Sequence, residues 1–417
     1  MNDQEIRQQK GVQLAAFCRI ERKGSVWMVP AQSKAGKYVV SPDKENPVCS
    51  CPDFEKRGQR CKHIFAVEIV EKREQNETGD MVCTSTVTVT EKISKPTYRQ
   101  DWPNYNAAQM NEKEHFQELL HDLCDGIEEP TRGKGRPPLP LGDSVFAAVF
   151  KIYSTVSCRR FTCDLNDAKE KGFVKVAPHY NSIFRCLESE ELTPILEAMI
   201  TESSLPLKAV ECDFAVDSSG FSTSRFIRWY DAKYRSIKEE HDWVKAHIAV
   251  GVKTNVITAV RILDRDAADS PQFPPLIKDT AKNFTVKEAS ADKAYGSLEN
   301  VEAVDEAGGT PFIAFRQNAT GAKGGKDGLW AKMFHYFSFR RDDFLQHYHK
   351  RSNVESTFSM VKAKFRDHVR SKTDTAMKNE VLCKFLAHNI CCLISAMYEL
   401  NIEPEFWTKK TAEQVSA

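Results

Sequence analysis

From about residue 209 onward, short apolar runs alternate with helical runs, and this order limits the possible folds more than any other feature of the chain. The runs at 210–216, 244–252 and 256–263 have a period of two and predict strands, with a hairpin turn at 253–255. The expected elements after them are a helix at 270–284, a strand at 286–291, a helix at 298–307, a strand at 311–315 and helices from 342. This order predicts an α/β fold with a mixed sheet.

The size and composition of the chain exclude several classes of protein. A chain of 417 residues predicts two or three domains, and 41% apolar with 28% charged residues excludes disordered, collagen-like and low-complexity chains. With 59 Lys and Arg against 58 Asp and Glu, a uniformly basic DNA-coating protein is also excluded, although local basic patches are not.

Cysteine usage and hydropathy predict where the protein works. Thirteen cysteines, an odd number without a signal-peptide pattern, argue against a disulfide framework. The apolar stretch 381–397 is interrupted by Lys384, His388 and Asn389, which predicts a buried helix and not a membrane span. We therefore expect a cytoplasmic protein, associated with the nucleoid if the source is bacterial.

The first residues form a small module with a metal-binding pattern. Cys49-Ser-Cys51 is followed after nine residues by Cys61-Lys-His63, and two close pairs of thiolate and imidazole ligands suit tetrahedral Zn²⁺. This spacing resembles the SWIM-type zinc finger, a module associated with DNA or protein binding. The resemblance covers about residues 25–75, and most of the other ten cysteines are expected to be packing residues.

Composition divides the chain into five segments. The zinc module is a small α+β unit, and an all-α region precedes the mixed sheet. A run of alternating Thr and Val at 84–90 is either a strand that closes the first module or extended linker. The expected boundaries are the zinc module at 10–75, a linker at 76–100, a helical region at 101–205, the α/β region at 206–400 and a tail at 401–417.

Three acidic residues are candidates for a catalytic site. Asp217 and Asp292 each follow an apolar strand where a turn is expected, although Asp is also a common turn residue. On one continuous helix Glu355 would share a narrow stripe with Tyr348, Arg351 and Lys362, because these residues are spaced at −7, −4 and +7 from it. The alternative for Glu355 is a surface ion pair with Arg351, worth a few tenths of a kcal/mol.

Taken together, these residues resemble the signature of insertion-sequence DDE transposases of the Tyr-Arg-Glu-Lys group. Asp217 and Asp292 are followed by Tyr348-x2-Arg351-x3-Glu355-x6-Lys362, and the resemblance covers about residues 97–400. The segments 216–221, 243–247, 291–296 and 349–358 are similar to the same family. Only 62 residues separate Asp292 from Glu355, so the large β-rich insertion of some relatives is not expected.

The resemblance implies an RNase H-like domain in which Asp217, Asp292 and Glu355 bind Mg²⁺ or Mn²⁺. Carboxylates are hard ligands that suit these ions, and two such ions can promote in-line displacement at phosphorus. The expected activity is metal-dependent cleavage at the element ends followed by strand transfer into target DNA. The DNA contacts would come from Tyr348, Arg351, Lys362 and Arg366, and the protein would act as a homodimer or larger assembly on double-stranded DNA with terminal inverted repeats.

Other segments carry weaker predictions about DNA. Residues 340–372 hold nine Lys and Arg against four acids, an excess of +5 that favours salt-sensitive DNA binding. The basic strip 132–136 is either a minor-groove contact or a solvated linker, and the helices at 143–200 are either a helix-turn-helix unit or a packing domain. The glycine-rich segment 321–328 lacks a P-loop ending and is expected to be a flexible loop near the DNA.

Two other classes of function stay open from the residues alone. The first is a non-catalytic zinc-finger DNA-binding protein with structural acids. The second is an RNase H-like nuclease that cuts DNA without joining it to a target.

Overall fold

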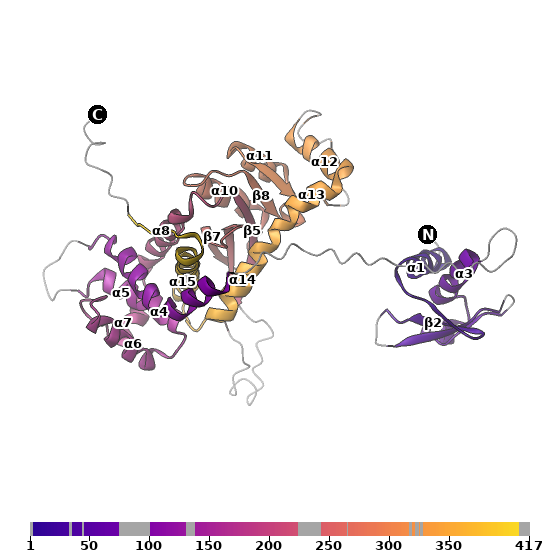
Figure 1. Cartoon of the computed structure of the whole chain (residues 1–417), viewed down its shortest axis with the longest axis horizontal. Coiled ribbons are helices and arrows are strands. Elements are labelled where there is room, and N and C mark those ends of the chain that lie inside the picture. Colours follow the sequence, from indigo (N-terminus) through magenta and orange to yellow (C-terminus); the bar gives the residue numbers. More distant parts are fainter. Residues whose placement is uncertain are drawn as a thin grey trace. The chain divides into compact units, whose positions relative to one another are not determined.

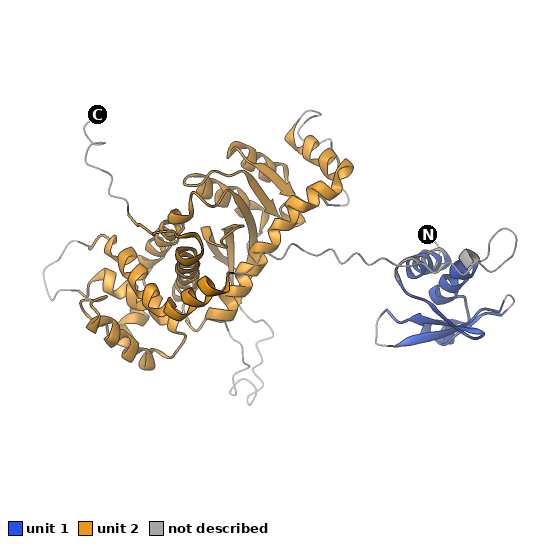
Figure 2. Ribbon diagram, in the orientation of Figure 1, with its two compact units in different colours: residues 1–98 blue, residues 99–417 orange. Residues whose placement is uncertain are grey.

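The computed structural model describes most of the chain as two compact units, residues 1–98 and 99–417 (Figure 2). Four segments lie wholly or mostly outside the described residues: the Thr and Val run at 84–90, the basic strip at 132–136, the 321–328 loop and the tail. The described residues are 3–32, 36–43, 46–74, 101–130, 138–223, 243–264, 266–316, 319–321, 325 and 328–407.

The first unit is a four-stranded antiparallel sheet covered by helices. The strands follow one another in the order β1-β2-β3-β4, and its core contains Trp27, Val29, Val40 and Ile64. Its elements are α1 (Asp3–Phe17), β1 (Glu21–Lys23), β2 (Val26–Pro30), β3 (Lys37–Ser41), β4 (Val48–Cys49), α2 (Pro52–Arg57) and α3 (Lys62–Glu74).

Helix α1 was not predicted, and its packing explains why. It contacts α3 closely enough that a Cβ on Gly11 would lie 2.6 Å from the Cβ of Phe65. Leu14 is fully buried. Because α1 is stabilised by a close backbone approach to a neighbour, its own sequence carries little periodic signal.

The second unit is built on a five-stranded mixed sheet in the order β7-β6-β5-β8-β9. Strands β5, β6 and β7 are antiparallel, whereas β8 and β9 run parallel to β5. The strands are β5 (Asp213–Ser222), β6 (Trp243–Gly251), β7 (Ile257–Asp264), β8 (Glu288–Ala291) and β9 (Thr310–Ile313). This arrangement confirms the predicted α/β class with a mixed sheet, and it is consistent with an RNase H-like domain.

Helices cover both faces of this sheet, as alternation along β5 requires. Phe214 and Val216 pack against α10 on one face, while Ala215 and Phe221 belong to the larger core with α14 and α15 on the other. The elements around the sheet are η1 (Leu205–Leu207), η2 (Ser270–Gln272), α10 (Phe273–Ala281), η3 (Lys293–Tyr295), α11 (Leu298–Glu306), α12 (Leu329–Phe339), α13 (Arg341–Tyr348), η4 (His349–Arg351), α14 (Ser352–Phe365) and α15 (Asp374–Leu400).

The remaining helices of this unit surround α15 (Figure 1). Among the described helices, α15 alone has the length and apolar character of a membrane span, but 72% of its most apolar window is buried within the unit. It is therefore the core helix that its interrupted apolar pattern predicts. Its neighbours are α4 (Trp102–Asp125), α5 (Leu141–Ser154), α7 (Tyr180–Leu187) and α8 (Leu192–Ser204), and α6 (Cys158–Glu170) packs on α5 and α7.

Two elements of the second unit differ from their predicted form in ways that affect the candidate site. Strand β5 continues past Asp217 to Ser222, because β6 supplies a paired partner along its whole length. The predicted single helix is interrupted, because α13 ends at Tyr348 and the 3-10 turn η4 precedes α14. Asp217 therefore lies within a strand, and the stripe around Glu355 is formed by three consecutive elements.

Candidate active site and metal centre

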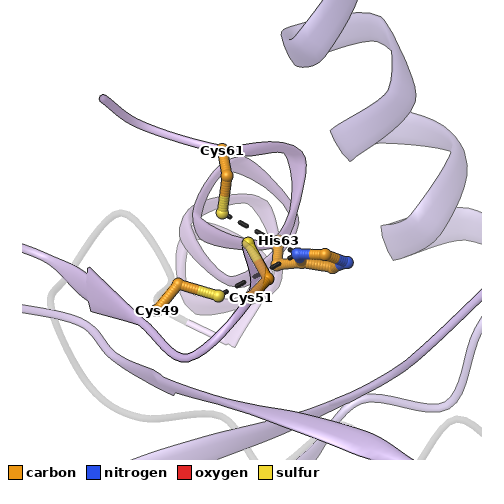
Figure 3. A group of neighbouring side chains, drawn as sticks. All are labelled: Cys49, Cys51, Cys61 and His63. Carbon is orange, nitrogen blue, oxygen red and sulfur yellow. Dashed lines mark hydrogen bonds between the residues drawn. The ribbon is translucent and has the colours of Figure 1, made fainter. Parts of the chain in front are cut away.

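The four predicted zinc ligands converge in the first unit (Figure 3). Cys49 ends β4 and Cys51 caps α2, where its sulfur accepts a hydrogen bond from the Phe54 amide at 3.4 Å. Cys61 directly precedes α3, and His63 lies in its first turn. The left-handed backbone at Gly58, φ 62°, ends α2 and turns the chain toward the second pair.

The geometry of this cluster fits a tetrahedral metal ion. Its four ligand atoms all lie within 4.8 Å of one another. His63 Nδ1 lies 3.9 Å from Cys49 Sγ and 3.8 Å from Cys61 Sγ. Bond lengths of about 2.0–2.3 Å around one zinc ion place its ligands about 3.5–3.8 Å apart.

The electrostatics of the cluster also favour a cation. The hydrogen bond from Cys49 lowers the pKa of the Cys61 thiol to about 4, whereas the same contact and burial raise the pKa of Cys49. Buried thiolates need a compensating positive charge, which a zinc ion at this centre would supply. The donor set and its burial fit Zn²⁺.

In the second unit, two of the predicted acids lie side by side at the sheet. Val216 on β5 pairs with Ala291 on the parallel strand β8. The residues that follow are Asp217 and Asp292, and each carboxylate accepts a hydrogen bond from the next backbone amide, at 2.8 and 2.6 Å. Because β5 and β8 are parallel neighbours, the two acids lie at the same level along the sheet, Asp217 within β5 and Asp292 directly after β8.

The third acid comes from α14, which packs on β5. Glu355 lies in its first turn and accepts a hydrogen bond from Arg351 Nη1 at 2.7 Å. The Tyr348 hydroxyl lies 3.5 Å from Asp292 Oδ1, and the Arg351 guanidinium lies over the Tyr348 ring at 5.5 Å. Residues from α13, η4 and α14 thus reach the acids of the sheet.

The carboxylates interact electrostatically. Burial is the largest cause that raises the pKa of Asp217, and the negative charges of Glu355 and Asp292 act in the same direction. The Ser218 amide and the Arg351 charge oppose this shift. A divalent cation would reduce the repulsion between this half-buried carboxylate and its two acidic neighbours.

The predicted basic residues divide into two groups. Lys362 Nζ donates to Ser219 Oγ at 2.7 Å, two residues beyond Asp217 on the same strand. Arg366 lies after α14 with φ 76°, and its Nη2 donates to the Thr155 carbonyl at 3.1 Å. The structure therefore brings Lys362 to the strand that carries Asp217, whereas Arg366 turns toward the end of α5.

A polar cluster beside Ser218 was missed by sequence reasoning. Asp269 accepts hydrogen bonds from Lys245 at 2.6 Å and Ser218 at 3.0 Å, and its Oδ1 lies 3.7 Å from His247 Nδ1. Among the described residues, neither ring nitrogen of His247 has a hydrogen-bond partner, and burial lowers its pKa to about 4. The segment 243–247 was noted only for its resemblance, because Asp269 is distant in sequence.

Two segments of the chain match known families. Residues 208–390, which contain Asp217, Asp292 and Glu355, match the family described as the transposase DDE domain. The chain carries a transposase DDE domain. Residues 38–72, which contain all four candidate zinc ligands, match the SWIM zinc finger. No curated protein matches the chain.

The resemblance to a transposase with a SWIM finger is thereby confirmed. The DDE family implies a protein that acts on DNA and uses a divalent metal ion. The three carboxylates of this domain fit such an ion by the chemistry of their oxygen donors.

Proposed function

We propose that this transposase cuts DNA at the ends of its element and joins those ends to target DNA, with Asp217, Asp292 and Glu355 as the metal ligands. The observation that carries the proposal is the pairing of Val216 with Ala291, because it sets two acids side by side next to a helix that brings a third. Mg²⁺ is the proposed ion and Mn²⁺ its substitute. Two bound ions would activate the attacking oxygen and stabilise the leaving oxygen.

The residues around the acids have distinct proposed roles. Arg351 orients the Glu355 carboxylate through its hydrogen bond, and its remaining donors are available to a DNA phosphate. Tyr348 lies beside Asp292, where its ring offers a surface for the terminal nucleotide. Lys362 places positive charge next to β5, where the scissile strand would run.

The proposed partners are the inverted repeats of the element and the target duplex. Arg159, Arg160 and Arg185 are exposed on α6 and α7, which supports a role of the helical region in binding element ends. The zinc finger would contact flanking DNA or another subunit. We propose a homodimer or larger assembly on DNA in the cytoplasm, associated with the nucleoid. The five predicted segments stay our proposed domain boundaries.

Removing each carboxylate tests the triad. Asp217→Asn, Asp292→Asn and Glu355→Gln should each abolish nicking of DNA that carries the terminal repeats, while binding of the same DNA is retained. The matched control is Asp305→Asn, which removes an exposed acid of α11's last turn and should cut normally. A triad variant that keeps substantial cleavage would remove that residue from the proposed ligand set.

The products separate the remaining classes of function. Joined target DNA identifies strand transfer, whereas cleavage without joining identifies a nuclease. Binding without any metal-dependent nicking would instead identify a non-catalytic DNA-binding protein.

A further inference from the structure

A positively charged pocket lies at the junction of α5, α14 and α15, apart from both sites described above. Its side chains come from the end of α5, the loop after α14 and the middle of α15. The lining residues are Lys151, Ile152, Thr155, Phe365, Arg366, Arg370, Glu380 and Lys384. Four cations therefore face one acid.

Lys151 is the most informative of these residues. Its side chain is only 6% exposed, and no acid within the described part of the chain forms an ion pair with it. A lysine this enclosed by its neighbours, with no acid at its ammonium, holds one positive charge at the wall of the pocket. Arg366, Arg370 and Lys384 line the same pocket, so its charge favours an anion.

Contacts within the pocket balance only part of the positive charge of its four cations. Glu380 accepts hydrogen bonds from the Arg370 and Ser371 amides and from the Ser371 hydroxyl. Lys384 Nζ donates to the carbonyls of Arg366 and His368 and lies 3.8 Å from Glu380. Burial lowers the pKa of Lys384 to about 8, and the charges of Lys151 and Arg366 act in the same direction.

Arg366 and Arg370 are both fixed at the opening of the pocket by hydrogen bonds to one carbonyl. Arg366 Nη2 and Arg370 Nη1 both donate to the Thr155 carbonyl, at 3.1 and 3.4 Å. Thr155 ends α5 in the left-handed conformation, so its carbonyl is available to side-chain donors. Each guanidinium keeps further N–H groups for a tetrahedral anion.

A line of cations connects this pocket with the proposed active site. Lys362 and Lys384 lie over the same ring, that of Phe221, each at 5.2 Å. Glu355 and Phe365, the last residue of α14 and part of the pocket lining, are 10 residues apart, or about 15 Å along the helix, the length of about four to five nucleotides of one DNA strand. A strand that runs along α14 from the active site would therefore bring a phosphate within reach of the pocket.

We propose that the pocket lined by Lys151, Arg366, Arg370 and Lys384 binds a single phosphate group, which the DNA strand that enters the active site supplies. The identity of the phosphate donor rests on the proposed function, whereas the affinity for phosphate does not. The pocket would fix the position of the strand a few nucleotides from the cleaved bond.

The first test uses inorganic phosphate on the full chain without DNA or added divalent metal. Phosphate should raise the melting temperature of the wild type, and Lys151→Met should lose that gain. Lys151→Met should also melt above the wild type in phosphate-free buffer, because it removes a charge that repels Lys384. Lys372→Met is the matched control, since Lys372 is exposed and outside the pocket, and it should keep the gain. Equal gains in the wild type and Lys151→Met would overturn the proposal.

The second test measures how binding of a short DNA duplex depends on salt. Lys151→Met and Arg370→Met should each lower the slope of log K against log salt by about 0.9, the value for one phosphate, with Lys372→Met unchanged. Arg370→Met provides this result even if Lys151→Met folds poorly. If phosphate stabilises the wild type but neither slope changes, a free anion fills the pocket and DNA as the source is wrong. Asp217→Asn should keep both responses, so a failed triad and a failed pocket give different results.

Discussion

At the scale of single residues, the second unit buries histidines that the proposed chemistry does not use. His388 on α15 is 5% exposed, and its Nε2–H donates to the Asn255 carbonyl at 2.9 Å. Burial lowers its pKa from 6.5 to about 4, as it does for His247. Both rings are therefore neutral in the folded protein near neutral pH.

These histidines predict a loss of stability in mild acid. Since folding lowers the pKa, the unfolded chain binds more protons between pH 6.5 and about 4. Each histidine contributes stability that is complete above pH 6.5 and is lost as the pH falls, by about 2 kcal/mol between about pH 7 and about pH 5. Urea unfolding of the second unit at the two pH values measures this loss. His388→Gln keeps a donor for Asn255 and should show a smaller pH dependence; an unchanged dependence would contradict the prediction.

Lys362 carries a second prediction at this scale. Its hydrogen bond with Ser219 holds it beside the strand of Asp217. Lys362→Ala should lower the salt slope of DNA binding by about 0.9, while Lys362→Arg should restore it. The matched control is Lys278→Ala on α10, an exposed position on the opposite face of the sheet. An identical slope in Lys362→Ala would mean that this lysine does not meet phosphate.

At the scale of elements, the start of α14 is fixed by an ion-pair cluster on the sheet. Asp213 and Glu288 are register partners on β5 and β8. Lys350 in η4 binds both carboxylates, each at 2.7 Å. The lysine thus separates two like charges and also anchors the turn that leads into Glu355.

Replacing this lysine should weaken the fold and the site together. Lys350→Met leaves the facing acids of β5 and β8 without their shared cation, and we expect a loss of about 1–2 kcal/mol in the free energy of unfolding. Glu288→Gln in the same chain should recover part of that loss, since it removes the repulsion. Chemical denaturation of the three chains measures the effect. If the double variant is no more stable than Lys350→Met, repulsion between the acids is not the cause.

The ion pairs of Lys350 and Lys364 show why the charge of a surface could not be predicted from a local stretch of sequence. The excess of +5 in residues 340–372 predicts a basic surface, yet Lys350 pairs with Asp213 and Glu288, and Lys364 with Glu112. These acids are distant in sequence, so local charge sums miss them. The zinc ligands were predictable because their spacing is local.

Strands and helices were likewise predictable where a local pattern determines them and not where distant residues do. The runs at 244–252 and 256–263 appear close to their predicted bounds, because a two-residue period is visible within each run. The continuation of β5 through Ser218 and Gly220 depends on its pairing with β6, and sequence reasoning took it for a turn. Helix α12 was also missed, since its many aromatic residues pack on α13 and β9 and give no clean helical period.

At the scale of the whole molecule, two compact units share one chain, and only the first contains the cysteine and histidine cluster. The first unit has a small core in which Cys49, Cys51 and Cys61 are themselves members. A metal ion at such a centre contributes directly to folding. The second unit has its own large core and takes none of its residues from the finger.

Zinc removal should therefore affect one unit and spare the other. The purified protein should contain about one zinc ion per chain, and Cys61→Ser should lose it and unfold the first unit. Elemental analysis and amide hydrogen exchange measure the two effects separately. The control is Cys163→Ser on α6, an exposed cysteine of the second unit, which should retain zinc and protection. A Cys61→Ser protein that loses protection throughout the second unit would show that the two units do not fold independently.

Helix α14 runs beside β5 in the same direction and is attached to it at both ends. Lys350 contacts Asp213, Lys362 contacts Ser219, and Ser222 forms a bridge with His368. Twelve residues at about 1.5 Å match six residues at about 3.3 Å, since both lengths are close to 20 Å. One added residue in α14 would shift Lys362 along the strand and rotate it by about 100°. The spacing of Arg351, Glu355 and Lys362 is therefore fixed by the length of the strand beside them. Substitutions at these positions keep that spacing, whereas an insertion or deletion in α14 would misplace every residue after it.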